Sequence, residues 1–415
     1  MLISLLFAAS AICAQPFQVG AAQLTVNPEN DTLYFAGGQK NRPFTGVHDN
    51  LYVKAVVIGH DNPELAILTI DCIGLMYPQL LEIREKVKTN QPNFPVERII
   101  MSSTHTHAGP DVVGIWGKDL MHSGINPAYM TRLVNRAAEV ILQAWKNRAP
   151  ARAEYAIGTF GTDWVSNIAE PELLDRSVTV MRFYDRRQKA IATLLNFACH
   201  PTILDDTATE ASADYVGGYY RYADSIQGGV NLFLQGAIGG WVQPETVPSS
   251  YYNAMKYGHL LGKYALDILE RRKVLKGGKI DFRSSAIQFP VTNRGFIMLS
   301  KAGVIARKIE QTVDSEIAYF RIGSSAFATH PGETSPALSL STKAMMPGKG
   351  PKFILGLAQD ALGYILKPTY FEPGNAIPHS AYLCSMSLGP ETMPILEASL
   401  LQLLQSSKAP ANDKR

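Results

Sequence analysis

Short apolar runs alternate with amphipathic segments along almost the whole chain, a pattern typical of α/β proteins. Runs rich in Val, Ile, Phe and Tyr between turn residues predict strands. The predicted strands cover residues 51–58, 65–70, 98–102, 178–184, 191–198, 230–235, 280–291 and 317–329. We find no internal repeat and no low-complexity linker. We therefore expect one α/β domain with mixed β-sheets flanked by helices.

Helical periodicity is clearest in three segments. Apolar residues recur every three or four positions at 79–88, 254–273 and 393–405. In the second segment Tyr257, Leu261, Tyr264 and Ile268 fall on one face. Such a stripe is typical of a helix that packs against a sheet.

The N-terminus has the pattern of an export signal. An apolar run ends in small residues at the two positions that a signal peptidase reads before Gln15. We expect residues 1–15 to be a cleaved signal peptide and the protein to be exported, either periplasmic or secreted; a buried N-terminal strand or helix is the alternative. Residues 16–405 would form the domain and 406–415 a polar tail. No apolar run reaches the about 20 residues of a permanent membrane span.

Composition excludes some functions. The formal net charge is +3, and no basic run is interleaved with aromatic residues, which argues against nucleic acid as a partner. Cys72, Cys199 and Cys384 remain after signal removal, an odd number without metal-ligand spacing. Neither a disulfide framework nor a cysteine metal site is expected. The sequence predicts no protein partner.

Three predicted strands are each followed by a side chain that can bind a metal ion. After the first, His105 and His107 are two residues apart and share a face in extended backbone. The second delivers His200 directly before Pro201, and the third runs through Pro-Gly to Glu333. Ligand sites tend to gather at strand ends, so we expect a metal site there.

These residue types fit a catalytic zinc site. Two neutral imidazoles, one carboxylate and an open position form a common ligand set for catalytic Zn²⁺. By spacing alone, scattered structural histidines explain the same residues about as well. The His-x-His pair by itself is equally consistent with a surface or core pair.

Four ordered segments resemble the catalytic domain of neutral/alkaline ceramidases. They are Ser-Thr-His-Thr-His at 103–107, Asn-Phe-Ala-Cys-His-Pro at 196–201, Pro-Gly-Glu at 331–333 and Gly-Leu-Ala-Gln-Asp-Ala-Leu-Gly-Tyr at 356–364. Stretches at 19–22, 46–52 and 70–74 also match, so the likeness covers nearly the whole mature chain.

The resemblance implies a site and an activity. It implies that His105, His200, Glu333 and Tyr364 hold zinc, and that His107 is a catalytic residue that contacts the substrate or stabilises the oxyanion. In this family a zinc-activated water hydrolyses an amide bond. Without the resemblance, Tyr364 would be interpreted as a core tyrosine.

Two further positions match the family less directly. Asp214 resembles an Asp that follows the second zinc histidine, which implies that it accepts a hydrogen bond from a ligand histidine. The alternative is an N-cap for the helix that enters Tyr219. Tyr370 lies where ceramidases place a tyrosine near the substrate carbonyl, which implies a catalytic role.

The sequence departs from the family pattern at three places. The segment from Gln235 to Gly240 replaces a serine-bearing stretch and an acid, which leaves only the mechanism through zinc-activated water. Asn-Ile-Ala at 167–169 stands where short bacterial relatives carry cations that can grip an anionic or sugar-like substrate. We expect a short form without the C-terminal immunoglobulin-like domain.

The sequence thus predicts a zinc-dependent hydrolase of an amide bond in a small-molecule or lipid-like, ceramide-like substrate. One alternative is a catalytically degenerate, zinc-containing binding protein, because the stretch at 235–240 is altered. Another is hydrolysis of a different bond, an ester or phosphoester. A single zinc without an Asp-rich cluster for two metals argues against the phosphoester.

Overall fold

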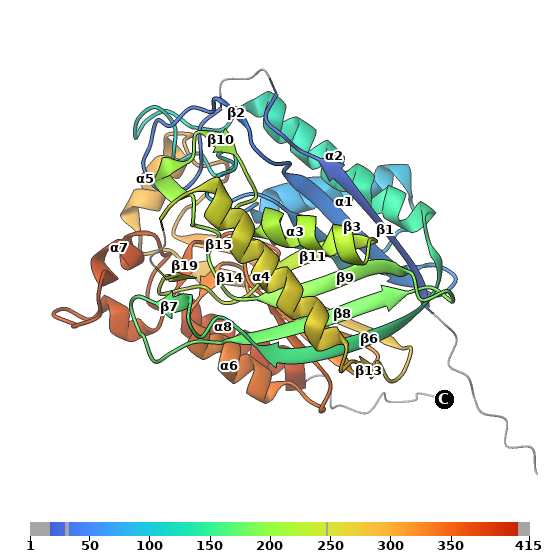
Figure 1. Ribbon diagram of the computed structural model, residues 1–415. Coiled ribbons are helices and arrows are strands. Elements are labelled where there is room, and N and C mark those ends of the chain that lie inside the picture. The colour runs from blue at the N-terminus through green and yellow to red at the C-terminus, as the bar shows by residue number, and fades with distance from the viewer. Residues whose placement is uncertain (1–16, 30–32, 246–247, 406–415) are drawn as a thin grey trace, which may run out of the picture.

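Two mixed β-sheets pack face to face, and helices cover the outer face of each (Figure 1). The computed structural model describes residues 17–29, 33–245 and 248–405. The expected signal peptide at 1–15 and the polar tail at 406–415 lie outside the described residues. The predicted α/β class with mixed sheets flanked by helices is confirmed.

The larger sheet consists of two halves. The order β5-β4-β3-β1 forms one half and β6-β8-β9-β11 the other, with β13 paired to β6. The strands are β1 (Phe17–Thr25), β3 (Tyr52–Gly59), β4 (Pro63–Ile70), β5 (Ile99–Ser103), β6 (Ala149–Thr159), β8 (Ser177–Tyr184), β9 (Ala190–Phe197), β11 (Val230–Gln235) and β13 (Lys273–Val274). Only three residue pairs of β1 and β6 join the halves. This short junction allows the far edges, β5 and β11, to approach each other.

The smaller sheet has the order β14-β15-β16-β18. Its strands are β14 (Ile280–Pro290), β15 (Thr312–Ile322), β16 (Ser325–Thr329) and β18 (Lys352–Leu355). The predicted strand at 317–329 is wrong as a single element, because Gly323 turns the chain with a φ of 55° and divides the run into β15 and β16. Three short pairs complete the strands: β2 (Gly46–Val47) with β10 (Glu210–Ala211), β7 (Val165–Asn167) with β12 (Val242–Pro244), and β17 (Glu333–Thr334) with β19 (Tyr364–Ile365).

The helices divide between the two outer faces. Contacts place α2, α3 and α4 on the larger sheet and α1 beside α2, whereas α6 and α8 cover the smaller sheet. Their bounds are α1 (Tyr77–Asn90), α2 (Pro127–Lys146), α3 (Tyr215–Ile226), α4 (Tyr251–Leu269), α5 (Arg294–Lys301), α6 (Pro336–Met345), α7 (Ser380–Ser385) and α8 (Thr392–Gln405). The helix predicted at 254–273 ends at Leu269, since residues 273–274 join the sheet as β13. None of the described helices is long and apolar enough to cross a membrane.

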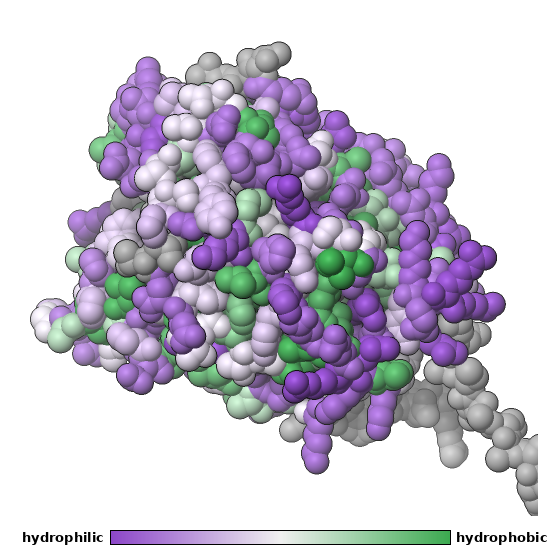
Figure 2. All heavy atoms as spheres, in the orientation of Figure 1, coloured by the Kyte–Doolittle hydropathy of each residue, from purple (hydrophilic) through white to green (hydrophobic). Residues whose placement is uncertain are grey.

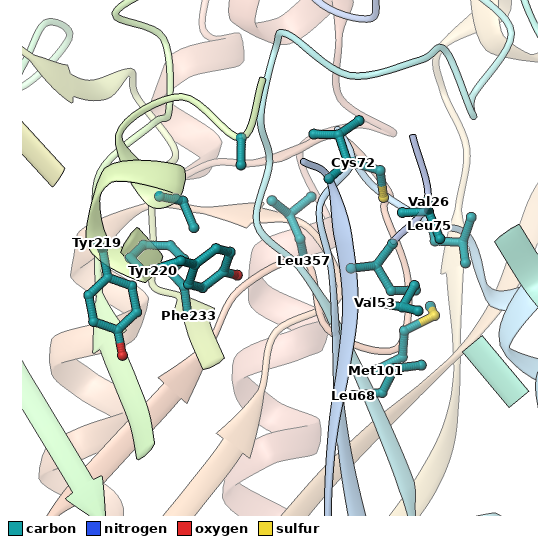
Figure 3. Close-up of a cluster of buried hydrophobic side chains, with 14 of the residues drawn as sticks. Val26, Val53, Leu68, Cys72, Leu75, Met101, Tyr219, Tyr220, Phe233 and Leu357 are labelled. Atoms are coloured by element: carbon teal, nitrogen blue, oxygen red, sulfur yellow. The ribbon is translucent and has the colours of Figure 1, made fainter. Parts of the chain in front are cut away.

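The unbroken apolar runs of the central strands follow from burial on both faces. In β3, Val53 and Val57 face the helices, while Val56 and Ile58 face the smaller sheet. Figure 3 shows the helix side of this core, where Tyr219 and Tyr220 of α3 lie beside Phe233 of β11, near the aliphatic side chains of β3, β4 and β5. Each such side chain contributes about 1.5–3 kcal/mol on full burial.

A buried lysine ties the two halves of the larger sheet together. Lys54 of β3 donates from Nζ to the carbonyl of Asn231 in β11 over 3.0 Å, and Nζ lies 3.2 Å from the ring centroid of Tyr220. The Tyr220 hydroxyl in turn donates to Asp71 over 3.2 Å. Burial lowers the pKa of Lys54 to about 8, against the attraction of Asp224 and Asp71, and burial raises the pKa of Asp71 to about 6. Both groups are therefore mostly charged at neutral pH.

We expect Lys54→Met to lower the free energy of unfolding by about 3–5 kcal/mol at pH 7, because Asp71 is then a buried charge without its cation. Adding Asp71→Asn removes that charge and should recover much of the loss. Urea denaturation of the two single variants and the double variant measures the coupling. Losses that simply add would show that Lys54 and Asp71 do not interact.

Candidate metal centre

His105 leaves β5 in a constrained conformation. Its amide donates to the carbonyl of Cys72 over 2.9 Å, and its Nδ1 donates to the carbonyl of Ile73. Its φ of 70° lies in the left-handed region, which few residues other than glycine adopt. Such strain persists where the surroundings hold it, and it is frequent at functional sites. The imidazole is buried with Nε2 directed away from the Cys72–Ile73 turn.

His200 is held in the same manner at the end of β9. Its amide and its Nδ1 both donate to the carbonyl of Val242 in β12, over 2.8 and 2.7 Å. The following Pro201 cannot continue a strand ladder, because it has no amide hydrogen. As in His105, a backbone carbonyl accepts the hydrogen bond from Nδ1, and Nε2 faces the interior.

Glu333 and Tyr364 are brought together by strand pairing. They are direct partners in the parallel pair of β17 and β19. Close backbone approaches require glycine on either side: a Cβ at Gly332 would lie 2.5 Å from the Gly363 carbonyl oxygen, and a Cβ at Gly239 2.5 Å from that of Glu333. In the Pro-Gly-Glu sequence, packing therefore requires the glycine, and the glutamate supplies the carboxylate.

These donors fit a divalent metal ion. Oε2 of Glu333 lies 3.0 Å from Nε2 of His200 and 3.4 Å from Nε2 of His105. Because both Nδ1 atoms donate to carbonyls, each neutral imidazole presents an Nε2 lone pair to the carboxylate. Lone pairs that face one another repel, and a cation between them removes the conflict. Burial raises the pKa of Glu333, but the positive charge and hydrogen bonds that His105 and His200 supply when protonated outweigh burial and lower it, as a cation in the cluster also would.

His107 stands beside this cluster. Its Nε2 lies 3.4 Å from Nε2 of His105, and the metal-competent nitrogens of His105, His107 and His200 all lie within 4.8 Å of one another. The geometry therefore admits two donor sets. One combines the three histidines, and the other combines His105 and His200 with Glu333 and Tyr364.

Gln235 links the two histidine loops. Its buried side-chain amide donates to the carbonyls of Thr104 and Cys199, over 3.0 and 2.9 Å, which are the residues just before His105 and His200. Its Oε1 accepts from the amide of Gly236 over 3.0 Å. Gln235, in the stretch that departs from the family pattern, thus fixes the distance between two candidate ligands. It presents no hydroxyl.

Trp241 is a site residue that the sequence interpretation missed. The hydroxyl of Tyr364 lies within hydrogen-bonding reach of the side chains of Trp241 and Glu333. Burial, and then the charge of Glu333, raise the pKa of Tyr364 well above its ordinary value, while Trp241 acts in the opposite direction. Trp241 has a φ of 59° and follows Gly240, so the altered Gly-Gly-Trp turn was the available signal.

Asp214 and Tyr370 lie outside the donor cluster. Asp214 caps α3: its carboxylate accepts from the amides of Tyr215 and Leu204, over 2.6 and 2.8 Å. The Nδ1 atoms of the candidate ligands instead bond to backbone carbonyls. Tyr370 donates its hydroxyl to Glu170 over 2.8 Å, and Glu170 also pairs with Lys367. Burial and then Glu170 raise the pKa of Tyr370, which keeps its phenol protonated.

A mostly apolar pocket, partly open to solvent, begins at the cluster. His105, His107, Glu333 and Tyr364 line one part of it. Its other walls are mostly apolar and include Ile73, Met76, Val113, Trp116, Phe296 and Leu388. The one cation in its lining, Arg307, is neutralised by Asp360 over 2.8 Å. The pocket therefore suits a chain of methylene groups that ends in a polar group near the imidazoles.

Comparison with known proteins supports the fold. No protein-family profile matches the chain. Neutral ceramidase from Pseudomonas aeruginosa is similar with a TM-score of 0.80 at 15% identity, over 96% of this chain and 76% of that one. A ceramidase complexed with C2 is similar with a TM-score of 0.80 at 15% identity, over 97% of this chain and 77% of that one. The neutral ceramidase-like fold predicted from the motifs is confirmed.

We expect Gly37→Ala to displace the His107 ring, because a Cβ at Gly37 would lie 2.3 Å from Nδ1 of His107. Gly374→Ala is the matched control, since its φ of 76° is close to the 78° of Gly37 and nothing lies within 4 Å of its Cβ position. Both variants carry a left-handed cost of about 1–2 kcal/mol. Gly37→Ala should lose about 1–3 kcal/mol more through the clash. Denaturation curves and the ring resonances of His107 measure this; equal losses with an unmoved ring would contradict it.

Proposed function

We propose that the protein is a zinc-dependent hydrolase of the amide bond in an N-acyl, lipid-like substrate. The observation that carries the proposal is a convergent set of metal-competent donors at the polar end of an otherwise apolar pocket. The ceramidase-like fold supports it. The signal peptide expected at 1–15 would place this activity outside the cytoplasm.

In this proposal His105, His200, Glu333 and Tyr364 hold the zinc. Zinc bound there would supply a Lewis acid and lower the pKa of a coordinated water towards about 7. The carbonyls of Ile73 and Val242 accept from Nδ1 of His105 and His200 and so hold the two imidazoles in the tautomer that such binding needs. The ionised Glu333 supplies negative charge in a buried setting, which strengthens cation binding.

His107 is the proposed proton carrier. Its Nε2 faces the donor cluster, and its ring borders the pocket, so it can take up a proton at Nε2 and deliver it to the leaving nitrogen. Tyr370 is proposed to turn its retained phenolic proton from Glu170 to the substrate carbonyl. The apolar pocket would hold the acyl chain, with about 0.8 kcal/mol for each methylene removed from water.

A second candidate is a catalytically degenerate protein that binds zinc and a lipid-like ligand. The observation in its favour is Gln235, whose amide is committed to backbone groups and offers no nucleophilic hydroxyl. Ester or phosphoester hydrolysis has no specific support among the described residues. Zinc content and the activity of His107→Ala on N-acyl amides distinguish the hydrolase from the binding protein.

We expect the purified mature protein to contain about one zinc ion per chain, and His200→Ala and Glu333→Gln to lose it on dialysis. His122→Ala is the control, because His122 is exposed and pairs with Asp119 away from the cluster. Elemental analysis provides the measurement, followed by assay with a short-chain N-acyl amide. A folded wild type without metal, or retention of zinc by both cluster variants, would refute the zinc site.

We expect His107→Ala to retain zinc and to lose about 10²–10⁴-fold in kcat, the range for removal of a general acid or base. Its pH–rate profile should lose one limb, which a purely structural change would not produce. Loss of zinc in this variant would instead identify His107 as a ligand and favour the three-histidine donor set. Zinc-loaded wild type that binds but never hydrolyses N-acyl amides would support the binding protein.

A further inference from the structure

Large apolar side chains are exposed on three segments that border the pocket. Leu120 and Met121 are 60% and 58% exposed in the loop that follows Trp116, Met298 is 57% exposed in α5, and Tyr382 is 50% exposed in α7. We call these four exposed side chains, Leu120, Met121, Met298 and Tyr382, the pocket rim. Single exposed apolar residues are ordinary, but a group around one pocket indicates an interaction surface.

The three segments contact one another. The amide of Ala306, shortly after α5, donates to the carbonyl of Val113 at the start of the loop over 3.2 Å. At the other end of α5, the side chain of Asn293 donates to the carbonyl of Ser385 in α7 over 2.7 Å. Each segment also contributes to the lining of the pocket. The pocket rim is therefore built from adjoining parts of the chain.

The loop presents its apolar pair in a fixed turn. The carboxylate of Asp119 accepts from the amide of Met121 over 2.8 Å and from the ring of His122 over 2.7 Å. Leu120 and Met121 lie at the tip of this turn. The turn therefore holds them exposed at a fixed place.

Cations accompany the pocket rim. Lys118 precedes the tip, and Arg294 and Lys301 lie at the two ends of α5; all three side chains are exposed. The stretch 292–309 contains four basic residues and no acidic residue. Arg307 pairs with Asp360 and Lys308 with Glu310, so only Arg294 and Lys301 of the four are counted with the pocket rim. None of the residues of α5 is buried, although Phe296, Ile297, Met298 and Leu299 make half of it apolar. Basic residues next to exposed apolar ones are typical of segments that lie at a bilayer interface.

We propose that the pocket rim docks on a lipid bilayer that contains anionic headgroups. The apolar tips would enter the interfacial layer, and Lys118, Arg294 and Lys301 would lie against the headgroups. A second copy of the chain fits less well, because a two-fold contact would bring the same cations face to face. The proposed function enters this inference only as the reason for docking. A docked rim would let a lipid-like substrate pass from the bilayer into the pocket without crossing water.

The test is flotation of the full chain with vesicles of phosphatidylcholine, with and without phosphatidylglycerol. We expect binding to the anionic vesicles, weaker at high salt. Met298→Asp and Leu120→Asp should abolish most of it. Arg294→Ala and Lys301→Ala should each reduce it about fivefold.

Matched controls lie on the α3 and α4 face. Figure 2 shows that on this face the apolar residues form small groups among hydrophilic ones. Ile226→Asp replaces a side chain that is 62% exposed, and Arg221→Ala with Lys256→Ala removes two exposed cations there. These control variants should bind anionic vesicles as the wild type does.

Wild type that does not bind anionic vesicles would overturn the inference. Equal losses of vesicle binding in the rim variants and the control variants would also overturn it. Self-association through the rim without vesicle binding would identify a second copy as the occupant and also overturn it. The vesicles contain no amide-linked lipid, so binding is measured without turnover. Vesicle binding without amidase activity would refute only the proposed function, and amidase activity without vesicle binding would refute only this inference.

Discussion

The site depends on the closure of two half-sheets that share only a short junction. After β18, the chain crosses the gap between their far edges: the amide of Gly356 donates to the carbonyl of Gln235 at the end of β11, and the amide of Gln359 donates to that of Met101 in β5. Leu357, between them, has a φ of 47°. Together with the side chain of Gln235, this crossing fixes where the loops after β5 and β9 meet. Every candidate metal donor is placed relative to that meeting point.

The electrostatics of these side chains then makes the packed cluster suitable for binding a metal ion. The Nδ1 atoms of His105 and His200 donate to backbone carbonyls, so the two Nε2 atoms and the carboxylate of Glu333 face one another in a buried space. In such a medium the repulsion of lone pairs is strong, and so is the attraction of a cation to all of them. The glycines around Glu333 serve the same end, because they allow the strand pair that positions the carboxylate.

The pocket extends the same division between polar and apolar groups outward. Polar donors lie at one end, apolar walls follow, and exposed apolar tips with neighbouring cations lie at the border with solvent. This gradient suits an amphiphile whose polar group reaches the imidazoles while its chain stays in the walls. The segments 113–124, 292–309 and 380–388 contribute much of these walls and carry no catalytic motif.

Local patterns in the chain were enough to predict the α/β class and most of the central strands, and they pointed to candidate donors at strand ends. The fold prediction succeeds because apolar periodicity is a local signal, and a Pro directly after a strand is a local signal as well. The sequence did not indicate the hairpin at Gly323, the link made by Gln235, the place of Trp241 or the pocket walls. These features became visible in the folded chain alone, because they depend on contacts between residues more than 30 positions apart or on a left-handed backbone that a local pattern does not reveal. The motif that contains each histidine is local, whereas the carbonyl that orients its ring lies 32 positions away along the chain for His105 and 42 for His200.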